Sequence, residues 1–304
     1  MKLRVLGSAA GGGFPQWNCN CRQCAGVRRG RPGLAARTQS SVAVGGPDDW
    51  LLVNASPDLL QQIQAAPGLQ PARSLRDSGI AAVLLCDGQI DHTTGLLMLR
   101  ERGTRLPLWC TDPVFEDLTQ GNPLLRVLDH FCGTQRHRVV PDGSPFEIPG
   151  VAGLRVRAIA LSSKPAPFSP RRAAPAVGDN VGLAFENAAT GRRIFYAPGL
   201  AAIDEALWRE MNRCDAVLVD GTFWVDDEMI RLGLSSKTAR DIGHLAQSGP
   251  GGMLEHLARL PGSTRKLLIH INNTNPILDE ASPERAACRA AGVEVCTDGM
   301  EVEL

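Results

Sequence analysis

AAVLLCDGQIDHTTGLLMLR, residues 81–100, is the stretch that decides the fold and locates its chemistry. An apolar run typical of a buried strand (82–85) is followed by two carboxylates, an amide and an imidazole within residues 87–92. In open α/β folds, ligand and metal sites form at the carboxyl ends of such strands. Asp91 and His92 would point to opposite sides of a strand, but a tight loop can direct both at one ion. The sequence therefore predicts a metal site here.

Two more apolar runs end in a residue that can bind a metal. Asp220 closes the run AVLVD, and His270 closes the run KLLIH. Because strand ends that are distant in sequence can meet at one sheet edge, we expect both residues to join the Asp91-His92 pair around a first-row transition metal. The alternative is structural: the two aspartates would cap helices, and His270 would be an ordinary half-buried histidine.

Strands and helices are spaced through both halves of the chain, which predicts a two-sheet α/β sandwich with its helices outside. A proline-rich loop is expected at 162–179, and loops of that length are usually lids or disordered segments. The expected strands lie at residues 2–7, 41–44, 50–54, 82–85, 109–110, 153–161, 181–185, 193–197, 216–220 and 266–270, with a terminal strand around Val302 and a turn at Gly45-Gly46-Pro47-Asp48. The expected helices begin at Ser56-Pro57-Asp58 and Ser282-Pro283-Glu284 or span 112–119 and 201–212.

The composition limits the classes of partner. The 304 residues include 32 basic and 32 acidic ones, so the formal net charge is zero. Because such a chain has no overall attraction for polyanions, we expect no nucleic-acid partner. The N-terminus has too short an apolar core for a signal peptide, and no run approaches the ~18 apolar residues of a membrane span. We therefore expect a cytoplasmic protein without a membrane span.

A second metal site is predicted in the cysteine-rich segment 17–26. Cys19, Cys21 and Cys24 lie within six of the 304 residues, and the chain has nine cysteines in all. In a cytoplasmic protein, three thiols at this spacing are typical of a zinc site, with three free thiols as the alternative. The other cysteines lie in or beside apolar runs, which is typical of small buried side chains.

Several motifs resemble those of a known superfamily. The runs NASP (54–57) and DGQIDHTTGL (87–96) are similar to signatures of the metallo-β-lactamase superfamily, whose metal motif normally reads His-x-His-x-Asp-His. Within it, FPQWNCNC (14–21), HINNTNP (270–276) and DGME (298–301) resemble the PqqB family of pyrroloquinoline quinone (PQQ) biosynthesis. The resemblance covers essentially the whole chain. It implies a single domain over residues 1–304, folded as a metallo-β-lactamase-like αββα sandwich of two packed mixed sheets with outer helices.

The chain departs from the superfamily pattern on one side of the metal site. Asp87 and Gln89 stand where two histidines normally hold the first metal, and the loop that normally supplies a third histidine reads Leu161-Ser162-Ser163-Lys164. Asp91, His92 and His270 remain, with Asp220 at the position that bridges two metals in relatives. Two histidines with one or two carboxylates are the ligand set of mononuclear iron(II) oxygenases, whereas a hydrolytic zinc pair needs more ligands.

The resemblance therefore implies an Fe(II)- and O₂-dependent hydroxylase. Its substrate would be the tyrosine ring of a Glu-Tyr unit derived from the PQQ precursor peptide, and other PQQ biosynthesis proteins would be partners. Asp91, His92 and His270 would bind the iron, and Asp220 would be a fourth ligand or a proton acceptor for the phenol.

Other side chains are expected around the substrate. Asp87 and Gln89 would bind it or orient the liganding histidines, as groups behind metal ligands commonly do. Ser162, Ser163 and Lys164 would close over the pocket, with Lys164 pairing with a substrate carboxylate. A solvated surface lysine is the alternative.

Two further assignments stay open. In phosphodiesterase relatives a histidine completes the cysteine-bound zinc, whereas Asn273 stands at the matching position here, and an amide oxygen is a weak zinc ligand. Asn275, water or Cys296 are the alternatives, and this zinc would be structural. His130, His137 and His256 lack spaced partners, whereas His244 follows Asp241-Ile242-Gly243 at an expected helix start and could instead line the pocket.

Two rival functions follow from the same depleted metal site. The first is a non-catalytic carrier that moves PQQ or its precursor towards the periplasm. The second is a zinc-dependent phosphodiesterase or other hydrolase.

Overall fold

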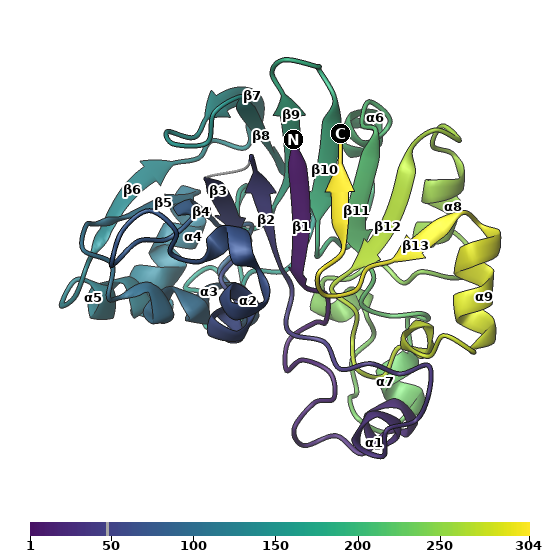
Figure 1. Ribbon diagram of the computed structural model, residues 1–304. Coiled ribbons are helices and arrows are strands. Elements are labelled where there is room, and N and C mark those ends of the chain that lie inside the picture. Colours follow the sequence, from purple (N-terminus) through teal and green to yellow (C-terminus); the bar gives the residue numbers. More distant parts are fainter. Residues whose placement is uncertain (47–48) are drawn as a thin grey trace.

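The computed structural model describes residues 1–46 and 49–304, in which two seven-stranded sheets pack against each other (Figure 1). The order in the first sheet is β14-β1-β2-β3-β4-β5-β6, and in the second it is β13-β12-β11-β10-β9-β8-β7. The first sheet consists of β1 (Lys2–Gly7), β2 (Ser41–Gly45), β3 (Trp50–Val53), β4 (Ile80–Leu84), β5 (Leu106–Cys110), β6 (Thr134–Arg138) and β14 (Glu301–Glu303). The second consists of β7 (Asp142–Glu147), β8 (Leu154–Ala160), β9 (Val181–Asn187), β10 (Arg193–Ala197), β11 (Ala216–Asp220), β12 (Arg265–Ile269) and β13 (Val293–Val295).

Helices cover the outer faces of both sheets, so the predicted αββα sandwich with mixed sheets is confirmed (Figure 1). α2, α3, α4 and α5 lie beside the first sheet, and α6, α8 and α9 lie beside the second. The α-helices are α1 (Arg22–Arg28), α2 (Leu59–Ala65), α3 (Ile90–Thr93), α4 (Asp112–Glu116), α5 (Leu124–Leu128), α6 (Glu205–Met211), α7 (Glu228–Arg231), α8 (Met253–Ala258) and α9 (Pro283–Ala290). Short 3₁₀ or π turns occupy η1 (Pro67–Leu69), η2 (Thr94–Leu99), η3 (Asp117–Gly121), η4 (Arg240–Ile242) and η5 (Pro276–Leu278).

The strands that carry the predicted ligands are buried on both faces. In β4, Leu84 packs between the sheets, whereas Val83 packs under the outer helices. β11 shows the same alternation, with Leu218 between the sheets and Val219 outside. Strands covered on both faces read as continuous apolar runs rather than as alternating patterns, which is why these segments stand out in the sequence.

Parallel pairing brings the ends of these strands together. β4 runs parallel to β3 and β5, and β11 runs parallel to β10 and β12. The loops after β4, β11 and β12 therefore emerge at the same edge of the sandwich, on the lower side in Figure 1. This edge holds the candidate metal centre.

Several predicted boundaries were wrong. The helix expected from Ser56 begins only at Leu59, and the one expected over 201–212 spans Glu205–Met211 because the Asp204 side chain accepts a hydrogen bond from Leu207 N. The helix expected over 112–119 is α-helical only to Glu116 and continues as the π turn η3. The edge strands β6 and β7 were not predicted, because their sequences, TQRHR and DGSPFE, have few apolar residues. The last two residues of the turn predicted at 45–48 lie outside the described residues.

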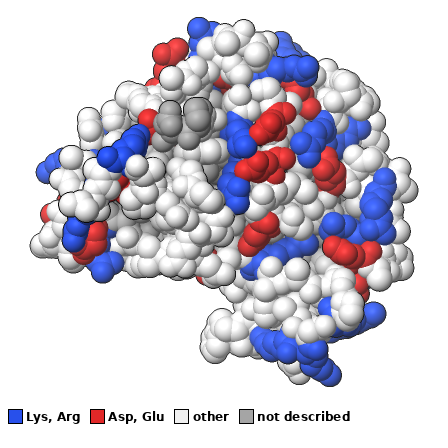
Figure 2. All heavy atoms as spheres, in the orientation of Figure 1, with Lys and Arg blue, Asp and Glu red and all other residues white. Residues whose placement is uncertain are grey.

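The two chain ends lie side by side, because β1 pairs with β14 and the Met1 amino group donates a hydrogen bond to Leu304 O at 3.1 Å. Charged side chains of both signs are interspersed over the face shown in Figure 2, whereas basic ones prevail around α1. No helix in the described part of the chain is long and apolar enough to span a bilayer.

Candidate metal centres

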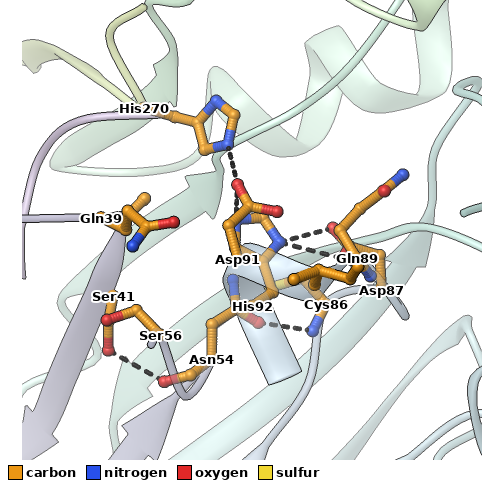
Figure 3. A network of polar contacts seen from close by, with 12 residues as sticks. Gln39, Ser41, Asn54, Ser56, Cys86, Asp87, Gln89, Asp91, His92 and His270 are labelled. Atoms are coloured by element: carbon orange, nitrogen blue, oxygen red, sulfur yellow. Dashed lines mark hydrogen bonds and ion pairs between the residues drawn. The ribbon is translucent and has the colours of Figure 1, made fainter. Parts of the chain in front are cut away.

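The loop between β4 and α3 is held by buried hydrogen bonds. Asn54, at the end of β3, has a positive φ of 60°, and its side-chain oxygen accepts a hydrogen bond from Cys86 N at 3.0 Å. A positive φ is uncommon outside glycine and persists only where the surroundings enforce it. This contact fixes the point at which the chain leaves β4, and Asp87 follows directly (Figure 3).

His92 is oriented by Asp87. The Nδ1 atom of His92 lies 2.9 Å from both carboxylate oxygens of Asp87 (Figure 3). The other ring nitrogen, Nε2, is buried and has no hydrogen-bond partner among the described residues. It lies 3.9 Å from Oδ2 of Asp91. A buried nitrogen without a partner is costly, so its position beside a carboxylate suits a bound cation.

His270 approaches the same carboxylate from the other sheet. Its Nε2 lies 3.2 Å from Asp91 Oδ2, and its backbone φ is 61° (Figure 3). The potential ligand atoms of Asp91, His92 and His270 all lie within 4.8 Å of one another. One carboxylate and two imidazoles in this arrangement fit a first-row transition metal.

Electrostatics favour charged side chains at this site. Burial by itself would lower the pKa of His92, but the carboxylates of Asp87 and Asp91 outweigh it and raise that pKa to about 9. Burial would raise the pKa of Asp91, but the imidazoles of His92 and His270 hold it well below its usual range. Metal binding at His92 Nε2 must therefore displace a proton.

The loop after β1, which contains Gly11-Gly12-Gly13, approaches the centre closely. A Cβ atom on Gly11 would lie 3.2 Å from Asp91 Oδ2. A side chain here would crowd the carboxylate, so Gly11 lets the loop lie close to the centre.

Asp220 lies beside His270, and its role as a fourth ligand or a proton acceptor stays a prediction. Its carboxylate groups with His244 and His270, while Asp91 and His92 group with His270 on the other side. The four predicted side chains therefore form two overlapping groups that share His270, rather than one cluster. Asp220 is fully buried, and its Oδ2 lies 2.7 Å from His244 Nδ1.

His244 is the site residue that the sequence analysis did not select. Thr222 Oγ1 lies 3.1 Å from its Nδ1 and 2.9 Å from Nδ1 of His270, so one hydroxyl bridges both rings. Burial would lower the pKa of His244, but Asp220 raises it above its ordinary value. The glycine before the histidine, Gly243, was the available signal: with a φ of 99° it turns the chain directly before the ring.

The remaining predicted pocket residues lie in two places, some near His92 and others near His244. Asp87 orients His92, whereas the Gln89 side chain has no hydrogen bond among the described residues and lies away from the two histidines in Figure 3. Ser163 Oγ donates to Gly243 O at 2.9 Å, which places it on the His244 side. Ser162 and Lys164 are exposed.

The proline-rich loop is irregular, as predicted, but a half-buried arginine holds it to the rest of the fold. Arg171 Nη2 lies 2.8 Å from Asp117 Oδ1, and its Nε lies 3.1 Å from Asp179. Ser169 Oγ also donates to Asp117, at 2.6 Å. At the end of the loop, Asn180 pairs with Asp87 in an isolated β-bridge. The loop therefore contacts the metal loop.

The three cysteines of the N-terminal segment form a separate cluster. The sulfurs of Cys19, Cys21 and Cys24 lie within 4.8 Å of one another, and all three are free thiols. The amide nitrogen of Asn273 donates to Cys24 Sγ at 3.4 Å and faces Cys21 Sγ at 3.9 Å. Asn273 thus reaches the cluster as predicted, but with a donor nitrogen rather than with a coordinating oxygen.

Comparisons with known proteins agree with this architecture. Residues 49–271 match the beta-lactamase superfamily domain. The chain is 61% identical to the coenzyme PQQ synthesis protein B of Azoarcus sp. (strain BH72), with 100% of both chains covered, and 59% identical to that of Cupriavidus necator, with 99% of both covered. Its structure is similar to the crystal structure of Zn²⁺-bound PqqB from Methylobacterium extorquens, with 40% identity, a TM-score of 0.89 and 100% of both chains covered. The chain therefore belongs to the coenzyme PQQ synthesis protein B family, within the β-lactamase superfamily.

Proposed function

We propose that this protein acts in PQQ biosynthesis as an Fe(II)- and O₂-dependent hydroxylase of the tyrosine ring in a Glu-Tyr unit derived from the PQQ precursor peptide. Membership of the coenzyme PQQ synthesis protein B family supports the pathway. The observation that carries the chemistry is the buried, unpartnered Nε2 of His92, which lies beside Asp91 and near His270.

Asp91, His92 and His270 would hold the iron. This is the two-histidine, one-carboxylate ligand set of non-haem iron(II) oxygenases. Bound ferrous iron supplies the electrons that let O₂ react with an organic substrate. A second metal of the hydrolytic kind would need ligands from Asp87 and Gln89, but Asp87 is already bonded to His92 and the Gln89 side chain lies away from the centre.

The protein's own groups would position the ligands and the phenol. Asp87 fixes the His92 tautomer by accepting its Nδ1 proton, so that Nε2 faces the centre. Asp220 holds His244 through Nδ1, which leaves His244 Nε2 to hydrogen-bond the substrate hydroxyl. Lys164, exposed beside Gly243, would meet a carboxylate of the glutamyl part.

The overall reaction would replace one ring C–H by C–OH. One atom of O₂ enters the product, and the other leaves as water with two protons. The two further electrons come from an external two-electron reductant.

Zinc would occupy the separate site formed by the thiols of Cys19, Cys21 and Cys24, because thiolate sulfur binds this cation well.

The test is anaerobic reconstitution with Fe(II), followed by a tyrosine-containing Glu-Tyr peptide, ascorbate and ¹⁸O₂. The proposal expects a product that has gained labelled oxygen on the ring, read by mass spectrometry. Tight binding of the peptide or of PQQ without turnover would favour the carrier instead. Cleavage of a test phosphodiester with zinc or manganese, without oxygenation, would favour the hydrolase. Either of these two results contradicts the proposal.

A further inference from the structure

The turn at residues 270–275, which we call the HINNTN turn, is polar in sequence yet buried. Its four polar residues after Ile271 are between 0% and 9% exposed: Asn272 9%, Asn273 4%, Thr274 3% and Asn275 0%. Asparagine and threonine are mostly found at the surface, and buried polar groups persist when they are hydrogen-bonded. A buried, satisfied polar turn is therefore rigid and has one preferred arrangement.

The two ends of the turn reach different centres. His270 points at Asp91, with 3.2 Å between Nε2 and Oδ2. Three residues later, the Asn273 side chain donates to Cys24 Sγ at 3.4 Å, and the Cys21 thiol donates to Asn273 O at 3.5 Å. Gln23, on α1, adds a hydrogen bond from Nε2 to Thr274 O at 3.1 Å.

The middle of the turn is held by the rest of the fold. Thr274 Oγ1 donates to the buried carboxylate of Glu228 at 2.5 Å and accepts from Asn272 Nδ2 at 2.6 Å. Asn275 Nδ2 donates to Gly221 O at 3.0 Å, beside Asp220. The turn therefore has little freedom to adjust at one end without moving the other.

We propose that the thiol cluster positions the His270 imidazole through Asn273, so that the two centres are energetically coupled. His270 keeps an uncommon positive φ of 61°, which its surroundings must enforce. A metal that draws the three sulfurs together would fix Asn273, and with it the turn that ends in His270. The Asn273 side chain is then a positioning group, and each centre binds its metal more tightly when the other is filled. This inference rests on the ligand assignments of the proposed function.

Cobalt(II) titration of the full-length, zinc-supplied protein tests the coupling. The visible d–d bands of cobalt report the Asp91–His92–His270 centre, and the lack of a sulfur-to-cobalt charge-transfer band checks that zinc still occupies the thiols. The compared proteins are the wild type, Asn273→Ala, Cys21→Ser and the double variant. Asn272→Ala is the matched control, because it lies in the same buried turn and its side chain donates to Thr274 Oγ1 rather than to a cysteine. Thermal unfolding of each protein checks folding.

We expect Cys21→Ser and Asn273→Ala each to weaken cobalt binding at the His270 centre roughly tenfold and to change its d–d spectrum. In the Cys21→Ser/Asn273→Ala double variant, cobalt affinity should fall no further than in either single variant. In the Asn272→Ala background, by contrast, Cys21→Ser should still lower cobalt affinity. Unchanged affinity in a folded Cys21→Ser protein, or losses that simply multiply in the double variant, overturns the coupling. If Asn273→Ala does not fold, Asn273→Ser, whose shorter hydroxyl cannot span the same distance, replaces it with the same expectation.

The two levels of the argument fail differently. If wild-type protein binds cobalt at an oxygen- and nitrogen-ligated centre, and Cys21→Ser leaves the cobalt affinity of that centre unchanged, only the coupling is contradicted. Wild-type protein without such a centre contradicts the ligand assignment and the coupling together.

Discussion

At the scale of single residues, the centre depends on how the ring of His92 is held. Asp87 binds one nitrogen and leaves the other buried beside Asp91. Asp87, which stands where the superfamily has a metal-binding histidine, thus orients the ligand His92 through a hydrogen bond to its Nδ1. Partners of this kind set both the tautomer and the basicity of a metal-binding histidine.

Replacing that support should weaken metal binding. Asp87→Ala leaves the His92 Nδ1 proton unpaired, so we expect metal affinity to fall by roughly 10–100-fold. Competitive Co(II) titration at fixed pH measures the loss. Asp142→Ala, which removes an exposed carboxylate that caps its own turn, is the matched control and should keep the wild-type affinity. Equal affinities for both variants would disprove the role of Asp87.

Removing a ligand should have a larger effect than removing its support. His92→Ala or His270→Ala leaves two of the three donors, and we expect no stoichiometric iron at the centre in metal analysis of protein purified without oxygen. His137→Ala, which removes a ring stacked on Trp109 in β5, should retain the metal. Full iron content in either ligand variant would be incompatible with the assignment.

At the scale of elements, the proline-rich loop is tied to the metal loop. Arg171 joins it to η3 through Asp117, which also accepts from Ser169, and to α4 through Pro113 O at 2.6 Å. Asn180 pairs with Asp87 at the end of the loop. The loop is therefore held at both places, and its end at Asn180 supports Asp87, which orients His92.

Removing the ion pairs of Arg171 with Asp117 and Asp179 should make the proline-rich loop more mobile. Arg171→Met leaves the Asp117 and Asp179 carboxylates buried without their cation, which costs about 3 kcal/mol of unfolding free energy. We expect faster proteolysis within residues 162–179. Arg172→Met, which removes a neighbouring arginine whose side chain donates to Pro165 O within the same loop, should be cut at nearly the wild-type rate. Equal cleavage rates would mean that Arg171 does not hold the loop.

The sequence predicted the fold to the extent that apolar patterning reports it. Strands buried on both faces, such as β11 and β12, were found almost to the residue, together with the metal-capable residues at their ends. The polar edge strands β6 and β7 were missed because little of their surface is buried. The pairing of His244 with Asp220 could not be predicted, because it depends on how a long loop returns to β11.

At the scale of the whole molecule, stability should depend on pH through a buried carboxyl group. Burial raises the pKa of Glu228 to about 7, although hydrogen bonds from Thr274 and Trp224 act in the opposite direction. Between its ordinary pKa and that value, the folded protein keeps a proton that the unfolded chain releases. Its contribution to stability is therefore present at low pH and is lost as the pH rises through this window.

Glu228→Gln removes this titration. We expect the unfolding free energy of the wild type, relative to the variant, to fall by about 3 kcal/mol at most between pH 4.5 and pH 7.5. Urea unfolding at several pH values measures this difference. A difference that stays constant or rises with pH would contradict the assignment of Glu228.

The central claim is that one iron binds at the edge of the sandwich, between the loops that follow β4 and β12. Anomalous diffraction at the iron edge, from crystals grown without oxygen in the presence of Fe(II), tests it most directly. The account predicts a single iron peak within bonding distance of Asp91, His92 and His270. Two metals side by side, or a peak that lies away from the His92 Nε2 atom, would contradict it.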